Sequence, residues 1–509
     1  MLTERQQQEL NRAVLQYLEP ILHDQHPDMV IKLQQILATT VDDDVIPNYL
    51  EKKWSTVLRL QKKIIDLQNE LANIRKIVDS QYANNSEGVV LSKDKINWLP
   101  YNATKTFATL SSQVINTVVV HPVLPNVLAG CSDGSLISWN LATDDTAMPD
   151  KYIKAHTRPV NKLCWSWWPV DIGGLKTHVV ASCSGDLSIK IWNGSNYSNI
   201  RTLTGHEHTV SSMAFSRTNP DMLYSVSRDK NVKIWDIVNG YCIKSFIGHS
   251  DWVRDVDVIS INSKLSLKTI EKSNLGDFLV TCSNDHSIRL SHAESGAGLA
   301  LLIGHSHVIE TVKFLPLTSN IWLDKYLTEN LGLHPTIPQE LVDYSGYTDT
   351  LGYKYCISGG RDNTVKIWLL PPPVLMPHRH PLPAKINNSQ GWLLADLAEH
   401  TSWVKSISIH PNGRFIFTGS DDKTIKVWDL SSLNVTGKVK CVRTLCGNEG
   451  FVNSVEFARI NGEIADKKDD ENTAKTGQEE HDEIMTRIEG KMRCLFVSGG
   501  SDNCVKLWS

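Results

Sequence analysis

The sequence predicts an all-β propeller of seven blades preceded by an α-helical arm, and three observations predict this fold class. First, an aspartate recurs seven times with a tryptophan or its substitute six positions later. Second, short apolar runs with period-2 alternation lie between these pairs, which is typical of antiparallel strands. Third, a heptad of apolar residues stands ahead of the first pair. The pairs are Asp133/Trp139, Asp186/Trp192, Asp229/Trp235, Asp285/Ser291, Asp362/Trp368, Asp422/Trp428 and Asp502/Trp508.

One repeat, residues 205–236, shows how each unit is built. Gly205-His206 opens it, and three apolar runs follow at 210–215, 222–226 and 232–235, with a polar turn before the third. A further run at 241–246 precedes the next Gly-His dipeptide. Each repeat therefore predicts four antiparallel strands joined by hairpins.

These residues resemble the WD repeat, which has Gly-His at one end, an aspartate turn, and Trp-Asp at the other. The resemblance covers residues 104–509 and implies a seven-bladed WD-repeat β-propeller. Trp508 is the penultimate residue, so the last repeat has no room for a fourth strand. The segment 106–110 has the composition of such a strand, and we expect it to close the last blade and remove an open sheet edge.

Insertions are expected between strands. Three of them span 166–177, 260–277 and 317–353, and a proline-rich stretch at 371–383 predicts an ordered surface connection. Residues 465–483 are acidic and poor in apolar side chains, which predicts a disordered loop.

The N-terminal arm divides into three parts. Residues 1–40 predict short helices, with Leu10, Val14, Tyr17 and Leu18 on one face, and so small a unit favours self-association. Residues 54–80 predict a coiled coil, and 81–103 a linker rich in Asn and Ser. An amphipathic helix packed on the chain's own propeller is the alternative to dimerisation. The expected dimerisation seam is Val57, Leu60, Ile64, Leu67, Leu71, Ile74 and Val78.

Composition excludes several classes of function. The net charge of −4 does not favour nucleic-acid binding. The ten cysteines include no Cys-x-x-Cys pair, so we expect reduced thiols in the cytosol rather than disulfides or a zinc site. The N-terminus is too polar for a signal peptide, and no apolar run is long enough to predict membrane insertion.

The many Asp, His and Ser residues have a structural explanation in the repeat. In WD propellers the turn aspartate, the Gly-His histidine, a strand Ser or Thr and the strand tryptophan form a buried hydrogen-bond network. The sequence holds no phosphate-binding glycine loop and no hydrolase motif, so we expect no catalytic, cofactor-binding or metal-binding residues. Two expected network sets are His206 with Asp229 and Trp235, and His400 with Asp422 and Trp428.

The residues that the repeat does not require indicate a binding surface. On a propeller, the residues that flank the start of each first strand share one face with the residue before each turn aspartate. Arg, Trp and Phe dominate protein-interface hot spots, and they gather at these positions. The alternative is a solvated face in which aromatics, above all Trp252 and Trp403, pack between neighbouring blades. The candidate face consists of Arg228, Trp252, Arg254, Arg361, Trp403, Lys405, Lys423 and Phe451.

The arm adds a second resemblance. Residues 10–14 with Tyr17-Leu18 are similar to a LisH dimerisation motif, and residues 51–54 with 59–63 are similar to the coiled coil of one particular family. That family is the lissencephaly-type regulators of cytoplasmic dynein, which include the fungal nuclear-distribution proteins. The resemblance implies motor binding by basic and aromatic residues at positions that match Arg228, Arg254, Arg361, Trp403 and Lys423 here.

The resemblance implies a non-catalytic homodimer that binds the dynein heavy chain motor domain. It would act with a nuclear-distribution coiled-coil adaptor and, indirectly, with microtubule plus-end proteins. Its expected places are the cytoplasm, microtubule plus ends and spindle poles, and its expected roles are nuclear migration and spindle positioning. Two alternatives remain open: a generic LisH/WD scaffold, such as a ubiquitin-ligase receptor or corepressor subunit, and a non-catalytic subunit of a lipid acetylhydrolase.

Overall fold

The structure is a computed structural model in which two compact units divide the chain, Met1–Lys95 and Ile96–Ser509. In the first unit the structure describes residues 10–11, 14–15, 17–18, 27–37 and 63. In the second it describes 99–509 except 110–112, 143–147, 261–275, 377–378, 385–389, 434–436 and 459–493.

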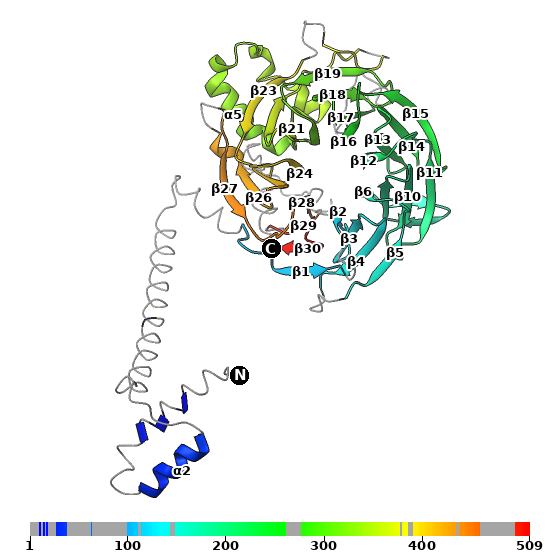
Figure 1. Ribbon diagram of the computed structural model, residues 1–509. Helices are drawn as coiled ribbons and strands as arrows, with labels where there is room; N and C mark the ends of the chain where they lie inside the picture. The colour runs from blue at the N-terminus through cyan, green and yellow to red at the C-terminus, as the bar shows by residue number, and fades with distance from the viewer. Residues whose placement is uncertain are drawn as a thin grey trace, which may run out of the picture. The chain divides into compact units, whose positions relative to one another are not determined.

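The second unit is a β-propeller in which seven four-stranded antiparallel sheets follow one another around a ring (Figure 1). Blades 1 to 3 consist of β2 (Ile115–Val120), β3 (Asn126–Cys131), β4 (Ser135–Asn140) and β5 (Lys151–Lys154); β6 (Val160–Trp165), β9 (Val179–Ser184), β10 (Ser188–Asn193) and β11 (Asn199–Thr204); and β12 (Val210–Phe215), β13 (Met222–Ser227), β14 (Asn231–Asp236) and β15 (Tyr241–Ile247).

Blades 4 to 7 complete the ring in the same way. They consist of β16 (Val253–Ser260), β17 (Asp277–Ser283), β18 (Ser287–His292) and β19 (Gly298–Ile303); β20 (Ile309–Phe314), β21 (Tyr355–Gly360), β22 (Val365–Leu369) and β23 (Trp392–Leu397); β24 (Val404–Ile409), β25 (Phe415–Ser420), β26 (Ile425–Asp429) and β27 (Lys440–Leu445); and β28 (Val452–Phe457), β29 (Phe496–Gly500), β30 (Cys504–Trp508) and β1 (Lys105–Ala108). The seven-bladed propeller expected from the repeats is confirmed.

The position of a strand in its blade decides how it is buried. The second strands are buried at every residue, as β9 is, or at every residue after the first, as β3 and β13 are, because neighbouring blades cover both of their faces. The outermost strand β15 alternates between exposed and half-buried residues, since one of its faces meets solvent. This difference explains why the second strands are continuous apolar or small-residue runs.

The ring closes through a strand from the beginning of the propeller sequence. β1 pairs antiparallel with β30, with Lys105 opposite Leu507 and Ala108 opposite Cys504. Phe107 of β1 is fully buried and belongs to a core cluster that contains residues of blades 1 and 7. The strand expected at 106–110 therefore lies at Lys105–Ala108, and it joins the two ends of the propeller sequence in one sheet.

The segment before β1 also belongs to the propeller. Leu99 is buried in the core cluster of blades 6 and 7, and Arg443 of β27 donates to the backbone oxygen of Leu99. The Arg443 guanidinium also lies 3.6 Å from the ring centroid of Tyr101. Residues 81–103 were expected to form a linker, but Leu99 and Tyr101 already pack against the propeller.

Two insertions form ordered structure on the ring. Residues 170–177 make a hairpin of β7 (Val170–Ile172) and β8 (Leu175–Thr177). The insertion 317–353 holds helix α5 (Asn320–Asn330), with Leu323 and Leu327 buried in the core cluster of blades 4 to 6. Short helical turns flank α5 at Leu317–Ser319, Leu331–Leu333, Gln339–Leu341 and Tyr347–Leu351, and a further one follows β26 at Leu430–Ser432.

In the N-terminal unit the structure describes helix α2 (Pro27–Leu37). The expected seam Val57–Val78 and the acidic segment 465–483 lie outside the described residues. Within the described parts of the chain, no helix is both long and apolar enough to cross a membrane.

Candidate functional site

The recurring Asp, His, Ser/Thr and Trp side chains form one hydrogen-bonded chain inside each regular blade. In blade 3, Trp235 Nε1 donates to Ser225 Oγ over 2.8 Å, and Ser225 Oγ lies 2.7 Å from His206 Nε2. His206 Nδ1 lies 2.7 Å from Asp229 Oδ2. The expected structural network is therefore confirmed in blade 3, and the set of blade 6 repeats it with Thr418.

This arrangement has the order of a hydrolase triad but not its accessibility. Ser225 is fully buried, and its oxygen accepts a hydrogen bond from the tryptophan beneath it. A nucleophile must reach its substrate, so this serine serves the fold. In blade 1, which lacks the histidine, Gln113 Nε2 donates to Asp133 Oδ2 over 2.6 Å instead.

The turn aspartates make stability depend on pH. Burial raises the pKa of Asp229, but the hydrogen bond and charge of His206 outweigh it and lower the pKa to about 2. Since an ordinary aspartate titrates near 4, this group stabilises the fold above that pH, and the contribution, on the order of 2 kcal/mol, is lost as the pH falls toward 2. The pKa values of Asp285, Asp362 and Asp422 are lowered in the same way.

We expect Asp229→Asn to lower the free energy of unfolding at pH 7 by about 2 kcal/mol and to flatten its decline between pH 5 and pH 3. Urea unfolding followed by circular dichroism measures both effects. Asp150→Asn, at an exposed aspartate, is the matched control and leaves both unchanged. Parallel acid profiles of wild type and Asp229→Asn would contradict this role of Asp229.

Two of the candidate binding residues, Arg254 and Lys405, owe their positions to a β-bulge near the start of every first strand. In each blade the pairing with the second strand skips one residue just after the first strand residue, as between Val253 and Asp255. A bulge turns the extra side chain out of the ladder and re-aims it. The skipped residues, in blade order, are Asn116, Asn161, Ser211, Arg254, Glu310, Lys405 and Asn453.

The bulge residue has a structural task in three blades. Asn116 Nδ2 donates to the backbone oxygen of Val160, the first strand residue of the next blade. Asn161 and Asn453 make the same bond to the next blade, at Val210 and Ile115. Blades 4, 5 and 6 replace this asparagine with Arg254, Glu310 and Lys405. The fold therefore does not require charge at these positions.

Cations from one blade stack on aromatic rings of the next. The Arg228 guanidinium of blade 3 lies 5.0 Å from the ring centroid of Trp252 in blade 4. Arg361 of blade 5 lies 4.2 Å from the ring of Trp403 in blade 6, and Lys405 Nζ lies 5.8 Å from the ring of Phe451 in blade 7. Arg254 approaches Trp252 within its own blade, at 3.6 Å. Such stacking orients the cations, whose side chains remain 14% (Arg254), 22% (Arg361) and 31% (Lys405) exposed.

Glu310 connects the two central arginines. Its Oε1 accepts from Arg361 Nε at 2.5 Å, and its Oε2 lies 3.5 Å from Arg254 Nη1. Burial lowers the pKa of Arg254, and so do the charges of Arg361 and Arg228, whereas Glu310 raises it. Two of these arginines pair with Glu310 and Arg228 adds a third positive charge beside them, so an acidic partner would relieve their repulsion.

The structure brings the predicted residues onto one face along blades 3 to 7, which we call the basic–aromatic face. Trp403 and Phe451 remain 39% and 46% exposed. Trp252 is half-buried, and its Nε1 donates to Ser211 Oγ of blade 3, so this ring also packs between blades. Lys423 is exposed in a left-handed turn conformation with φ of 68°. Sequence reasoning missed Glu310, although aligning the seven bulge positions would have found it.

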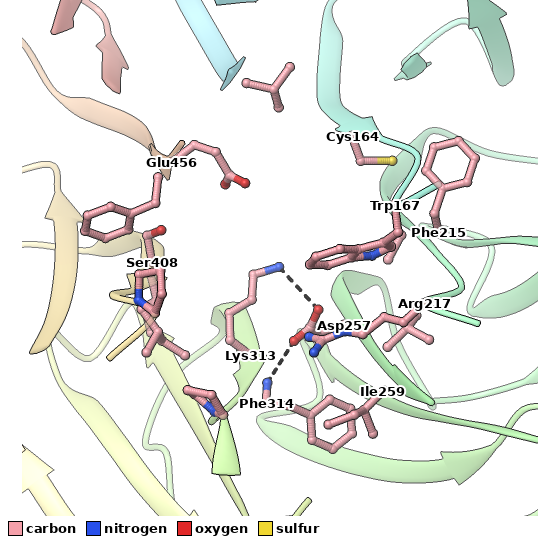
Figure 2. A pocket seen from close by; sticks show the side chains of 18 of the residues that line it. Cys164, Trp167, Phe215, Arg217, Asp257, Ile259, Lys313, Phe314, Ser408 and Glu456 are labelled. Atoms are coloured by element: carbon pink, nitrogen blue, oxygen red, sulfur yellow. Dashed lines mark hydrogen bonds and ion pairs between the residues drawn. The ribbon is translucent and has the colours of Figure 1, made fainter. Parts of the chain in front are cut away.

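The opposite mouth of the central channel holds a separate pocket of about 380 Å³ (Figure 2). It is lined by residues at the far ends of the first strands. Lys313 Nζ lies 3.9 Å from Asp257 Oδ1, and Arg217 lies 5.0 Å from the Trp167 ring. Burial lowers the pKa of Lys313, but Asp255 and Asp257 outweigh it and raise the pKa. Asp255 and Asp257 therefore balance the charge of Lys313 in this pocket, whereas cations outnumber carboxylates on the basic–aromatic face.

This is a WD-repeat β-propeller protein, as the ring of repeated blades and the Asp-His-Ser-Trp networks show. Its basic–aromatic face is a candidate protein-binding surface. The family model "WD domain, G-beta repeat" matches residues 197–236, 240–290 and 391–429.

Curated relatives match the chain over its full length. The nuclear distribution protein PAC1 of Scheffersomyces stipitis is 62% identical over 520 residues, which cover 100% of this chain and 99% of that protein. PAC1 of Debaryomyces hansenii is 60% identical, with 100% and 99% covered, and nuclear distribution protein nudF of Aspergillus niger is 29% identical, with 100% and 99% covered. The chain belongs to the nuclear distribution protein PAC1 family, which includes fungal members.

Proposed function

We propose that this protein is a homodimeric, non-catalytic regulator of cytoplasmic dynein that binds the motor domain through the basic–aromatic face. Membership of the nuclear distribution family favours this function over a generic scaffold or a hydrolase subunit. In this proposal the chain supports motor delivery to microtubule plus ends, nuclear migration and spindle positioning. A nuclear-distribution coiled-coil adaptor would be a further partner.

The proposal rests on one observation, namely that charged residues replace asparagine at the bulge position of three neighbouring blades. Blades 1, 2 and 7 use asparagine there to tie neighbouring blades together, whereas blades 4 to 6 place Arg254, Glu310 and Lys405. These charges lie beside exposed aromatics, and a cationic face on a chain of net charge −4 favours an acidic partner. Binding regulates the motor only if the propeller prefers one motor conformation over another.

The proposed dimer rests on the arm. In the described part of the arm, Leu15 is buried, but Leu10 and Tyr17 are each 44% exposed, and Met29 and Ile36 are 55% and 76% exposed. Apolar side chains left exposed on so small a unit favour burial against a second copy. The heptad seam Val57–Val78 would extend the same contact.

Mass photometry of the full chain and of a variant lacking residues 1–80 tests both parts, each chain alone and with a monomeric dynein motor domain. We expect a dimer and a monomer respectively, and we expect both to bind the motor with an affinity that falls as salt rises. A truncated chain that stays dimeric would overturn the arm assignment. A dimer that fails to bind the motor at low salt would overturn the motor assignment.

A further inference from the structure

Two exposed tryptophans lie on the face of the ring opposite the basic–aromatic face, where the first strands end. Trp167 and Trp168 follow β6, the first strand of blade 2, and are 40% and 52% exposed. The tryptophans of the repeat, by contrast, are at most 4% exposed. The pair belongs to the connection that holds the β7–β8 hairpin, which is not part of the four-stranded blade. Since tryptophan is enriched among interface hot spots, these rings mark a candidate contact surface.

The neighbouring loop of blade 3 holds both rings in place. Trp168 Nε1 donates to the backbone oxygen of Arg217 over 2.8 Å. The Arg217 guanidinium lies 5.0 Å from the ring centroid of Trp167, and both side chains belong to the wall of the pocket in Figure 2. Val170, which follows the pair, is fully buried in a core cluster with residues of blade 3. The two rings are therefore ordered before a partner binds, which lowers the entropy cost of binding.

Two carboxylates lie at the same seam between blades 2 and 3. Asp171 is exposed in β7, and Asp221 is half-buried in the loop that leads into β13. In the described part of the chain neither carboxylate forms an ion pair, although Lys176 lies opposite Asp171 in the hairpin. Burial raises the pKa of Asp221, and so do the charges of Asp236 and Asp171. A positive charge supplied by a partner would relieve this repulsion.

We propose that these side chains bind an arginine-bearing segment of a second partner protein. A guanidinium stacks on an indole ring and also donates two hydrogen bonds to a carboxylate, so the tryptophans and the aspartates favour the same group. Val123 and Leu124, in the loop after β2 at the same end of the ring, are 59% and 42% exposed and suit apolar neighbours of that arginine. The tryptophan–carboxylate surface consists of Trp167, Trp168, Asp171 and Asp221.

The two faces of the ring thus select partners of opposite charge. The basic–aromatic face lies at the starts of the first strands and suits an acidic partner, whereas the tryptophan–carboxylate surface lies at their ends and suits a basic one. Because the ring separates the two surfaces, one propeller can hold both partners at once. The second surface does not depend on the proposed motor binding, so Trp168→Ala should leave the affinity for the motor unchanged.

Fluorescence polarisation of the full chain with a labelled peptide tests the proposal. The probe is a fluorescein-labelled peptide of about twelve residues that repeats Gly-Arg-Leu-Ser, and its control has glutamate in place of arginine. We expect the arginine peptide alone to bind, at least about tenfold more weakly to Trp168→Ala and about fivefold more weakly to Asp171→Asn/Asp221→Asn. Trp168→Phe keeps an aromatic ring and should recover most of the affinity. Circular dichroism checks that each variant is folded.

Matched controls separate this surface from general attraction between charges. Tyr241→Ala removes an aromatic ring that is 54% exposed, and Glu329→Gln/Asp343→Asn neutralises two exposed carboxylates elsewhere, so both should bind the peptide as the wild type does. The proposal is overturned if folded Trp168→Ala binds as tightly as the wild type, or if the carboxylate control loses as much affinity as the paired aspartate variant. It is also overturned if the chain lacking residues 1–80 is a dimer that Trp168→Ala dissociates, because a second copy then covers the surface.

Discussion

Replacing Arg254, Arg361 and Trp403 together by alanine is expected to weaken binding to the dynein motor domain by about 100-fold or more. Truncation of one hot-spot residue costs about 2 kcal/mol or more, and a 100-fold loss corresponds to roughly 2.8 kcal/mol, so the estimate allows for strong non-additivity. The three residues are linked, because Glu310 contacts both arginines and Arg361 stacks on Trp403. Equilibrium binding of the full chain to a purified motor domain measures the loss.

A control must remove one aromatic and two cationic side chains elsewhere on the propeller. Trp168→Ala with Lys176→Ala and Lys325→Ala removes one aromatic and two cations, all of them exposed and away from the basic–aromatic face. We expect this variant to bind the motor as the wild type does. If the folded variant with alanine at Arg254, Arg361 and Trp403 binds the motor with unchanged affinity, the proposed binding face is wrong, whatever the control variant does.

Phe107→Ala is expected to lower the free energy of unfolding by about 3–5 kcal/mol, the cost of removing a fully buried phenylalanine from a packed core. Phe107 lies on the closing strand, with its ring centroid 6.3 Å from that of Trp139, and it packs with Val505 and Leu507 of the last blade. The substitution therefore weakens the contact between the first and last blades. Urea unfolding of the full chain measures the effect.

Thr106→Ala supplies the control for the closing strand. Thr106 is the neighbouring strand residue and is exposed, so its truncation should change stability by less than about 0.5 kcal/mol. If Phe107→Ala also costs less than about 1 kcal/mol, the closing strand does not hold the ring together in solution.

The repeat made the fold predictable because local chemistry recurs in every blade. The six-residue spacing from Asp to Trp locates the turn and the third strand of each blade. The alternation of apolar and polar residues locates the strands before and after it. The same regularity identified Arg254 and Trp403 as residues that the repeat does not need. Glu310 was missed because the search was for basic and aromatic residues, and a glutamate is neither. Glu310 matters because the bulge places its carboxylate within ion-pair distance of both Arg254 and Arg361.

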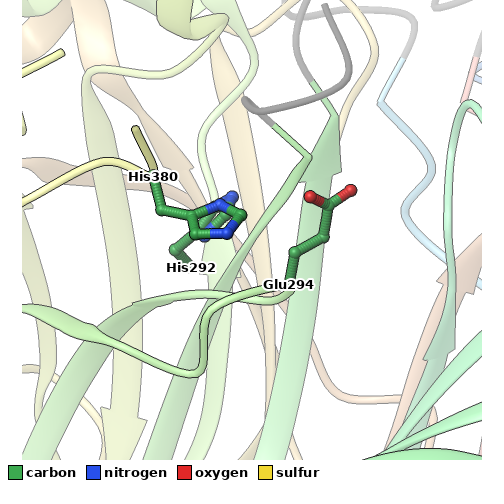
Figure 3. Close-up of side chains that lie close together, drawn as sticks. All are labelled: His292, Glu294 and His380. Carbon is green, nitrogen blue, oxygen red and sulfur yellow. The ribbon is translucent and has the colours of Figure 1, made fainter. Parts of the chain in front are cut away.

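Apart from the pairing of the closing strand with the last blade, contacts between distant segments could not be predicted from the sequence. Leu99 was assigned to a linker because residues 81–103 are rich in Asn and Ser, yet it is buried between blades 6 and 7. His292 and His380 are far apart in the chain and meet only because the proline-rich connection returns to blade 4 (Figure 3). In the arm the sequence gives a clear heptad pattern, but the residues of that pattern lie outside those that the structure describes.

Site-specific photo-crosslinking tests the location of the motor contact most directly. A photoreactive phenylalanine analogue is placed at Phe451 on the basic–aromatic face, and in a second chain at Tyr241, which is 54% exposed on the outer strand β15. We expect the analogue at position 451 to crosslink to the dynein motor domain and the analogue at 241 to give no crosslink. Crosslinking from position 241 but not from 451 would contradict the proposed binding face.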